Sequence, residues 1–179
     1  MPVPALCAVW LAMALLIGGA APAAGAGFDA KDGQILGRML GYVGDGKSGV
    51  AVVGVVFSPT NRASQQELEL VQSVIGDGLV TGRIRLQVRP VPVEQLAAVT
   101  GLSALYLTDG VTGDVDAIFD AAKRLQVPTV SASLGCVGSG RCVVGFTSEP
   151  TVQILLNQEA AERLGVHFLQ AFRMLVREK

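Results

Sequence analysis

The sequence has few residues of the types that most often build catalytic and metal sites. It contains one histidine, His167, and three cysteines, one of which lies near the N-terminus at position 7. The other two cysteines and the histidine are too few for a zinc site, which uses about four such ligands. A Ser-His-Asp or Cys-His device could use only His167. We therefore expect no metal, no cofactor and no enzymatic activity.

Charge is also scarce. Only 16% of the residues are charged, and 14 Lys+Arg against 15 Asp+Glu give a formal net charge of −1. A chain without a basic excess lacks the field that attracts phosphate backbones, so we expect no nucleic-acid partner. Half of the residues are hydrophobic, which is enough for the chain to bury a core and offset its ordering entropy. The chain should be globular.

The first 26 residues have the pattern of a signal peptide. An apolar run of 13 residues, 5–17, is followed by small residues and by an Ala-Gly-Ala cleavage pattern at 24–26. The run is too short to span a bilayer, although the segment before it carries no Lys or Arg and leaves a retained anchor as the alternative. We predict that residues 1–26 are removed. The mature chain, residues 27–179, is then one periplasmic domain with no direct membrane insertion.

The mature chain keeps two cysteines, Cys136 and Cys142. They flank a Gly-rich segment that can turn tightly enough to bring both Cβ atoms within bonding reach. An oxidising compartment closes such pairs, and a loop of this length is stabilised by about 2.4 kcal/mol. We predict a structural disulfide. A redox switch or a metal-binding thiol pair is the alternative, although the spacing matches no common motif of either kind.

Apolar periodicity predicts helices and strands that alternate along the chain. Residues 33–43 have helical spacing, and residues 49–57 form an apolar run typical of a strand buried on both faces. Ser64 and Glu67 have the spacing of a helix capping box. Residues 83–89 alternate between polar and apolar, which indicates a strand at the edge of a sheet. Further elements are expected at 93–99 and 114–125 as helices, and at 103–108 and 128–133 as strands. Such alternation is typical of a parallel α/β sheet.

The pattern changes near the C-terminus. Residues 142–147 and 151–156 are predicted strands, and the connection between them is too short for a crossover helix. Asn157 can cap a helix over 158–164, and the apolar spacing of 166–176 predicts a last amphipathic helix. The expected fold class is therefore α/β: a single domain with a mostly parallel open sheet, flanked by helices, and an antiparallel hairpin near the C-terminus.

Polar residues after two of the predicted strands are candidates for a ligand site, because ligands of open α/β sheets bind outside the carboxyl ends of the strands. The loop after the strand 49–57 supplies hydroxyls, an amide and a guanidinium that could hold a carboxylate or amide group. The alternative is that this loop is polar only because it is solvated. The candidate ligand-binding residues are Ser58, Thr60, Asn61, Arg62 and Asp109.

The predicted last helix supplies a candidate partner surface, with Leu169, Phe172 and Leu175 on its apolar face. An exposed apolar patch on a secreted domain usually marks an interface, here with a second copy of the chain or with a membrane-bound sensor or signalling protein. The alternative is that this helix docks on the sheet as part of the core.

Segment 151–169 reads as a strand that ends in Asn, an Ala-rich helical turn, a Gly and a Leu-rich end. This order resembles the closing signature of the YfiR-type periplasmic proteins. The segments 103–108 and 128–133, followed by a Gly-rich break, look like the two core strands of that family. The resemblance covers most of residues 34–175.

The resemblance implies a small secreted α/β domain without a known catalytic site. Better understood members restrain a membrane-bound diguanylate cyclase by binding its periplasmic sensor region. This chain lacks the family's Trp-Pro at 42–44, reduces a Gly-Gly pair to Gly140-Arg141, and lacks a second cysteine pair seen in some members. These departures concern the partner and any redox gating more than the fold.

Taken with the resemblance, the residues predict a non-enzymatic periplasmic regulator or adaptor that acts by protein contact. The alternative is a small-molecule binding module, similar to one lobe of an ABC-transporter solute-binding protein. Such proteins close two lobes on a ligand and are about twice as long as this chain.

Overall fold

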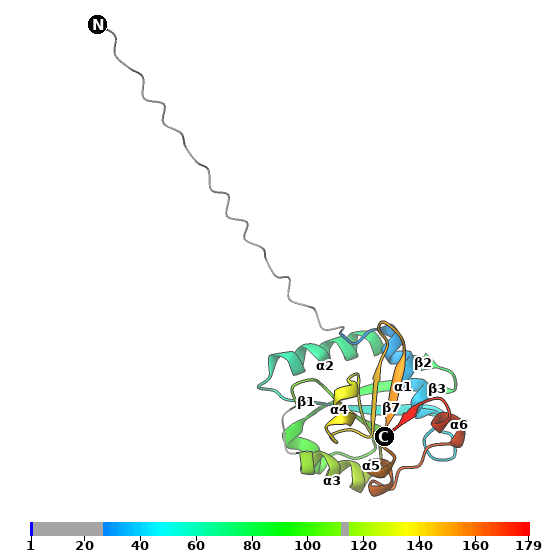
Figure 1. Ribbon diagram of the computed structural model, residues 1–179. Coiled ribbons are helices and arrows are strands. Elements are labelled where there is room, and N and C mark those ends of the chain that lie inside the picture. Colours follow the sequence, from blue (N-terminus) through cyan, green and yellow to red (C-terminus); the bar gives the residue numbers. More distant parts are fainter. Residues whose placement is uncertain (2–26, 112–114) are drawn as a thin grey trace.

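The computed structural model describes residue 1, residues 27–111 and residues 115–179 (Figure 1). The predicted signal peptide, 1–26, therefore lies outside the described residues except for Met1. In the part of the chain that is described, every helix is too short or too polar to cross a bilayer.

One eight-stranded sheet runs through the domain, in the order β2-β3-β1-β4-β5-β6-β7-β8. Its strands are β1 (Gly49–Phe57), β2 (Leu79–Thr81), β3 (Ile84–Pro92), β4 (Ala104–Leu107), β5 (Thr129–Ser131), β6 (Val144–Thr147), β7 (Gln153–Leu156) and β8 (Arg177–Glu178). The five strands from β3 to β6 in this order are parallel, whereas β2 pairs antiparallel with β3 and β7 pairs antiparallel with β6. The predicted mostly parallel sheet and its C-terminal hairpin are confirmed.

Helices lie on both faces of this sheet. They are α1 (Ala30–Leu40), α2 (Arg62–Ile75), the 3-10 helix η1 (Val93–Ala98), α3 (Val115–Leu125), α4 (Leu134–Gly138), α5 (Gln158–Arg163) and α6 (Gln170–Arg173). The helices α1 and α2 pack against each other and against β3, whereas α3 packs against η1. Figure 1 shows α2 along one side of the sheet and α3 along the opposite side. The single α/β domain expected from the sequence is thus confirmed.

The strand β1 lies in the middle of the sheet, and it contains no polar side chain. Val53, Val55 and Val56 are fully buried, and β1 pairs with β3 on one side and β4 on the other. From Ala51 to Val56 the run is covered on both faces, as expected for a strand inside a parallel sheet, whereas Val50 at its start is exposed. The carboxyl end of β1 consequently lies beside that of β4, and the loops that follow the two strands meet.

The prediction that 83–89 is an edge strand holds only in part, because β2 pairs with residues 84–86 and leaves the rest of β3, residues 87–92, paired with β1 alone among the described strands. The strand β3 lies between β1 and the short β2, which pairs with it from Leu79 to Thr81. Its alternation is real, since Ile84 and Leu86 are buried while Arg85 is exposed. The polar face reflects a part of the sheet that faces solvent, as Val50 beside Arg85 is also exposed. Alternation therefore reported a solvated face, which an inner strand can have as well as an edge strand.

The capping box predicted at Ser64 and Glu67 is also wrong. The helix α2 begins at Arg62, and its N-cap is Asn61, whose side chain accepts a hydrogen bond from the Ser64 backbone N–H. Asparagine is among the strongest N-cap residues, and it stands three residues before the predicted cap. Ser64 lies inside the helix and is fully buried.

The long last helix predicted over 166–176 does not form. Phe168 instead makes an antiparallel bridge with Val43, the short α6 follows, and β8 then pairs in parallel with β7. The backbone N–H of Leu169 donates to the carbonyl of Tyr42 at 2.9 Å. The backbone groups of this segment form hydrogen bonds with the residues just after α1 and with the edge of β7. These bonds replace those of a helix, so tertiary contacts override the local periodicity.

Candidate functional site

The loop after β1 contains three of the predicted ligand residues, and Arg62 is the first residue of α2. Two of the loop residues contact α2. The Ser58 N–H donates to the Ser64 hydroxyl at 2.9 Å, and Asn61 caps the helix. Asn61 also packs against Gly110 after β4, where an added Cβ would lie 2.6 Å from its Nδ2. Thr60 is exposed, with its hydroxyl 3.2 Å from that of Ser58. The polar character of this loop is used mostly to hold the loop.

A chain of buried hydroxyls continues this internal use of polar groups. The Thr108 hydroxyl donates to the Val56 carbonyl at 2.9 Å, and the hydroxyls of Ser64 and Thr108 are 2.6 Å apart. Since the Thr108 proton is committed to Val56, Ser64 donates to Thr108 and accepts from the Ser58 N–H. These bonds join β1, α2 and β4, and they leave neither hydroxyl free for a ligand.

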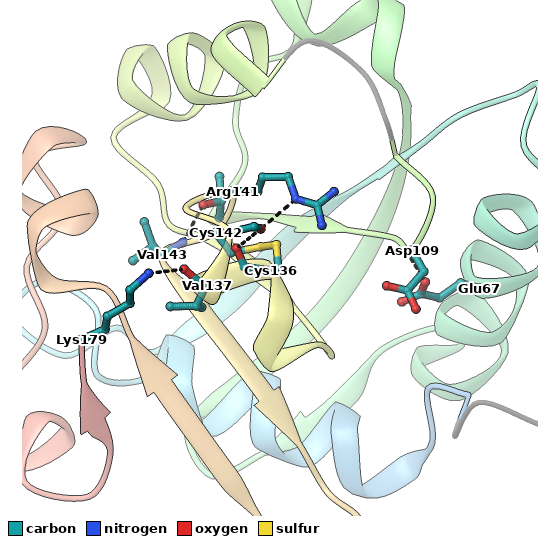
Figure 2. The surroundings of a disulfide bond; sticks show 10 residues. Glu67, Asp109, Cys136, Val137, Arg141, Cys142, Val143 and Lys179 are labelled. Carbon is teal, nitrogen blue, oxygen red and sulfur yellow. Dashed lines mark hydrogen bonds between the residues drawn. A yellow bond between two sulfur atoms is a disulfide. The ribbon is translucent and has the colours of Figure 1, made fainter.

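Glu67 lies at the centre of a second cluster, which the sequence assigned to helix capping. Its carboxylate accepts from the Tyr106 hydroxyl at 2.6 Å and from the Asp109 backbone N–H. Burial raises the pKa of Glu67, and these two hydrogen bonds offset part of that rise. Burial also raises the pKa of Tyr106 well above its usual value. Figure 2 shows the Glu67 and Asp109 side chains next to each other.

The predicted pairing of Cys136 with Cys142 is confirmed. The two residues are joined by a disulfide with their Cα atoms 5.3 Å apart (Figure 2). The sequence between them was expected to be a Gly-rich turn, but its first part forms the helix α4. The backbone N–H of Arg141 then donates to the Cys136 carbonyl at 2.9 Å, which reverses the chain. A short helix and a turn thus replace the simple turn.

The disulfide region is held against the sheet at two points. Gly145 of β6 lies under α4, where an added Cβ would be 2.5 Å from the Ser133 carbonyl oxygen. At the other end of α4, the Lys179 ammonium donates to the carbonyls of Val137 and Gly138 (Figure 2). The end of the chain therefore closes over the end of the helix.

A small cavity of about 50 Å³ lies at the carboxyl ends of β4 and β5, next to the disulfide. Its polar lining residues are Thr108, Asp109, Ser131, Ser133 and Arg141. Only Asp109 belongs to the predicted ligand set, since the loop 58–62 does not line this cavity. The predicted ligand residues follow β1 and β4, whereas this cavity lies between β4 and β5.

The predicted partner residues separate into buried and exposed positions. Phe172 is only 2% exposed, and its ring stacks on those of Tyr42 and Phe168 at centroid distances of 5.6 and 5.1 Å. The prediction that Phe172 contacts a partner is therefore wrong, because its side chain is part of the core. Leu169 and Leu175 are exposed, at 37% and 71%.

A larger groove of about 440 Å³ lies beside Leu175, between α1, β7 and the segment around α6. Ile35, Tyr42 and Ile154 form its apolar floor and walls, and Arg38 stands among its polar residues. This groove was not visible in the sequence, because it joins segments that are more than a hundred residues apart.

The single histidine, His167, lines neither the small cavity nor the larger groove. His167 is exposed, and its backbone carbonyl accepts from Gly44 at 2.8 Å. Within residues 27–111 and 115–179, no group of three or more His, Cys, Asp or Glu side chains is placed to hold a metal ion.

The comparisons with known proteins support the fold class and nothing finer. No family model matches the sequence, and no curated protein matches it. The chain is similar to the crystal structure of a conserved domain protein from Vibrio cholerae O1 biovar eltor, with a TM-score of 0.57 and 15% identity over 83% of this chain. The match spans 59% of that structure's length. It supports the α/β fold described above.

A second solved structure is less similar. It is an ABC domain in complex with L-Trp from Streptococcus pneumonia, with 10% identity, a TM-score of 0.49, and coverage of 72% of this chain and 54% of that one. Neither match names the YfiR-type family, so the resemblance to that family stays a prediction.

Proposed function

We propose that this protein is a non-enzymatic periplasmic regulator or adaptor that acts by contact with another protein. The partner that fits the resemblance is the periplasmic sensor region of a membrane-bound signalling enzyme, such as a diguanylate cyclase. One observation carries the proposal: three apolar side chains, Leu169, Met174 and Leu175, are exposed by 37%, 77% and 71% on the C-terminal segment. We call these three residues the C-terminal apolar surface.

Exposed apolar side chains gathered in one segment are a common mark of an interface. Met174 and Leu175 are consecutive, and Leu175 borders the groove that also contains Ile154 and Tyr42. Burying a fully exposed side chain of this kind is worth about 1.5–3 kcal/mol before the entropic cost of association, and the three residues here, exposed by 37–77%, would each contribute a part of that. A partner that presents an apolar helix or strand could insert side chains into this groove while it covers the surface.

Ser58 and Asn61 give little support to the alternative, a ligand site in the loop after β1. The Ser58 backbone N–H and the Asn61 side chain hold α2, the Ser58 hydroxyl contacts that of Thr60, and the neighbouring hydroxyls of Ser64 and Thr108 are hydrogen-bonded to each other. A ligand would have to break these contacts or use only Thr60 and Arg62.

The test is site-directed photocrosslinking in the cell envelope. A photoreactive residue at position 175 should crosslink to one integral membrane protein, whereas the same residue at Leu70, an exposed leucine on α2, should not. Crosslinks only to a second copy of the chain would favour a homodimer as the occupant of the surface. Equal crosslinking from both positions would contradict the proposal.

A functional assay complements the crosslinking. Deletion of the protein should raise the output of the partner enzyme, for example the cyclic di-GMP level, and the wild-type chain should restore it. Leu175→Asp should fail to restore it while folding normally, and Leu70→Asp should restore it. Restoration by Leu175→Asp would contradict a role for the C-terminal apolar surface.

A further inference from the structure

The cavity at the carboxyl ends of β4 and β5 carries opposite charges that do not neutralise each other. Asp109 and Arg141 both line it. The ion pairs found among the described residues are Lys31 with Glu149 and Arg173 with Glu178, so Asp109 and Arg141 stay apart. Two opposite charges that face one small space and have no ion-pair partner among the described residues are suited to a ligand that itself carries both signs.

Arg141 offers donors to this space. Its Nε donates to the Ser139 hydroxyl at 3.0 Å, and its two terminal nitrogens have no partner among the described residues. Figure 2 shows the guanidinium on the side of the disulfide on which Asp109 lies. A planar guanidinium with free terminal N–H groups matches the two oxygens of a carboxylate.

Two serine hydroxyls stand beside Arg141 in the lining. Ser131 is only 3% exposed, and its hydroxyl has no hydrogen bond to the rest of the described chain. Every side-chain polar atom that is sealed from solvent in the described residues has a partner, so the Ser131 hydroxyl must open to the cavity. Ser133, which begins α4, makes no side-chain capping bond. Both hydroxyls are available to an oxygen-rich group.

The opposite side of the cavity is negative. The Asp109 side chain lies next to the Glu67 carboxylate, and the two carboxylates repel each other. The Glu67 oxygens are engaged with Tyr106 and with the backbone of Asp109. Asp109 therefore presents the accessible carboxylate, in a place where a cation lowers the repulsion.

We propose that this cavity binds the head group of a small zwitterion of the α-amino-acid class. The ligand carboxylate lies on Arg141 with the hydroxyls of Ser131 and Ser133, and the ammonium lies on Asp109. A volume of about 50 Å³ accommodates several water positions, since one water needs about 10–15 Å³ on this measure. Val111 and Ile118 are among the apolar residues that line the cavity.

The disulfide acts as a positioning element for this site. Arg141 directly precedes Cys142, and its backbone is tied to Cys136 within the closed loop. Ser133 is held by the close approach of its carbonyl to Gly145. The positive side of the cavity is thus built on one short, crosslinked segment, 133–142, which limits the entropy lost when a ligand is bound.

The experiment uses the oxidised mature protein and L-alanine as the probe, with binding followed by NMR titration. We expect saturable shifts for L-alanine, whereas acetate and ethylamine, which carry one charge each, should bind at least about tenfold more weakly. Arg141→Gln and Asp109→Asn should each weaken L-alanine binding by about tenfold or more. The matched controls Arg85→Gln and Asp77→Asn change exposed residues outside the cavity and should leave binding unchanged.

Two results would overturn the proposal. If acetate binds as tightly as L-alanine and Asp109→Asn does not weaken either probe, the cavity is an anion site and not a zwitterion site. If L-alanine causes no saturable shift in the folded wild-type protein, the cavity has no such role. This proposal does not depend on the proposed protein contact, because Leu175 does not line the cavity. Leu175→Asp should therefore leave L-alanine binding intact.

Discussion

The loop after β1 and the C-terminal segment 166–179 differ in how far their side chains are used within the fold. Polar groups of the loop form internal hydrogen bonds, whereas apolar side chains of the segment stay exposed. In the loop, the Asn61 side chain looks like a ligand group but caps α2, and the Ser58 backbone N–H bonds to the Ser64 hydroxyl. In the C-terminal segment, Phe172 and Leu175 are both candidate partner residues in the sequence, but Phe172 is 2% exposed and Leu175 is 71% exposed. Residue chemistry alone thus does not separate the groups that the fold uses from those that it leaves exposed. The groups that remain unsatisfied after folding are the better indicators of function.

Phe172 and Leu175 give the sharpest test of this comparison, because they are three residues apart and differ most in burial. Phe172→Ala should reduce the free energy of unfolding by about 3–5 kcal/mol, since it leaves a cavity between Tyr42 and Phe168. Leu175→Ala should change it by less than about 0.5 kcal/mol. Denaturant unfolding measures both. Similar losses for the two variants would mean that the C-terminal apolar surface belongs to the core.

The disulfide should give the next largest effect. Replacing both Cys136 and Cys142 by serine should lower the free energy of unfolding by about 2.4 kcal/mol, because the unfolded chain regains the freedom of the closed loop. The measurement is denaturant unfolding of the oxidised protein and of the double variant. Intact mass of the oxidised wild type should show one disulfide and a mature start near Gly27. Free thiols at both positions in the exported protein would contradict the structural role.

Asn61 should show that the polar loop after β1 serves stability. Asn61→Ala removes the N-cap of α2 and should cost about 1 kcal/mol, whereas Thr60→Ala, at an exposed neighbouring position, should cost less than about 0.5 kcal/mol. Thermal or denaturant unfolding distinguishes them. If Thr60→Ala costs as much as Asn61→Ala, the capping interpretation fails.

Glu67 should give the smallest effect, visible as a pH dependence. Burial raises the pKa of Glu67 in the folded protein above its usual value of 4.5. The folded state therefore binds this proton more tightly than the unfolded state, and the stability linked to it is complete below pH 4.5 and lost as the pH rises through the folded pKa. The difference in unfolding free energy between wild type and Glu67→Gln should fall over this range. Glu69→Gln, on the exposed face of α2, is the control. A flat difference curve for Glu67→Gln would contradict the raised pKa.

The sequence predicted the parts of the fold that follow from local pattern. The apolar run of β1, the cap at Asn157 and the cysteine pair each depend on residues close together in the chain, and all three are present. The hairpin β6-β7 was predictable because its connection is too short for anything else.

The remaining features depend on contacts that no local pattern contains. The position of β3 depends on the three-residue β2, which is too short to give a periodic signal. The last helix was lost to pairing with Tyr42 and β7, which are distant in the chain. Glu67 joined Tyr106 and Asp109 because α2 packs beside β4, and Arg141 reached the cavity because of the turn after α4. Charged residues in such positions look like ordinary surface residues in the sequence.

The short strands that close the described sheet have a consequence for how copies of this protein behave when crowded. The outer strands β2 and β8 have three and two residues, and β8 consists of Arg177 and Glu178, both charged and exposed. At the β8 border, two charged residues offer little backbone for another chain to extend, which disfavours edge-to-edge growth there. The exposed leucines and methionine near the C-terminus can therefore favour association through side chains, while the adjacent β8 edge disfavours the addition of a strand.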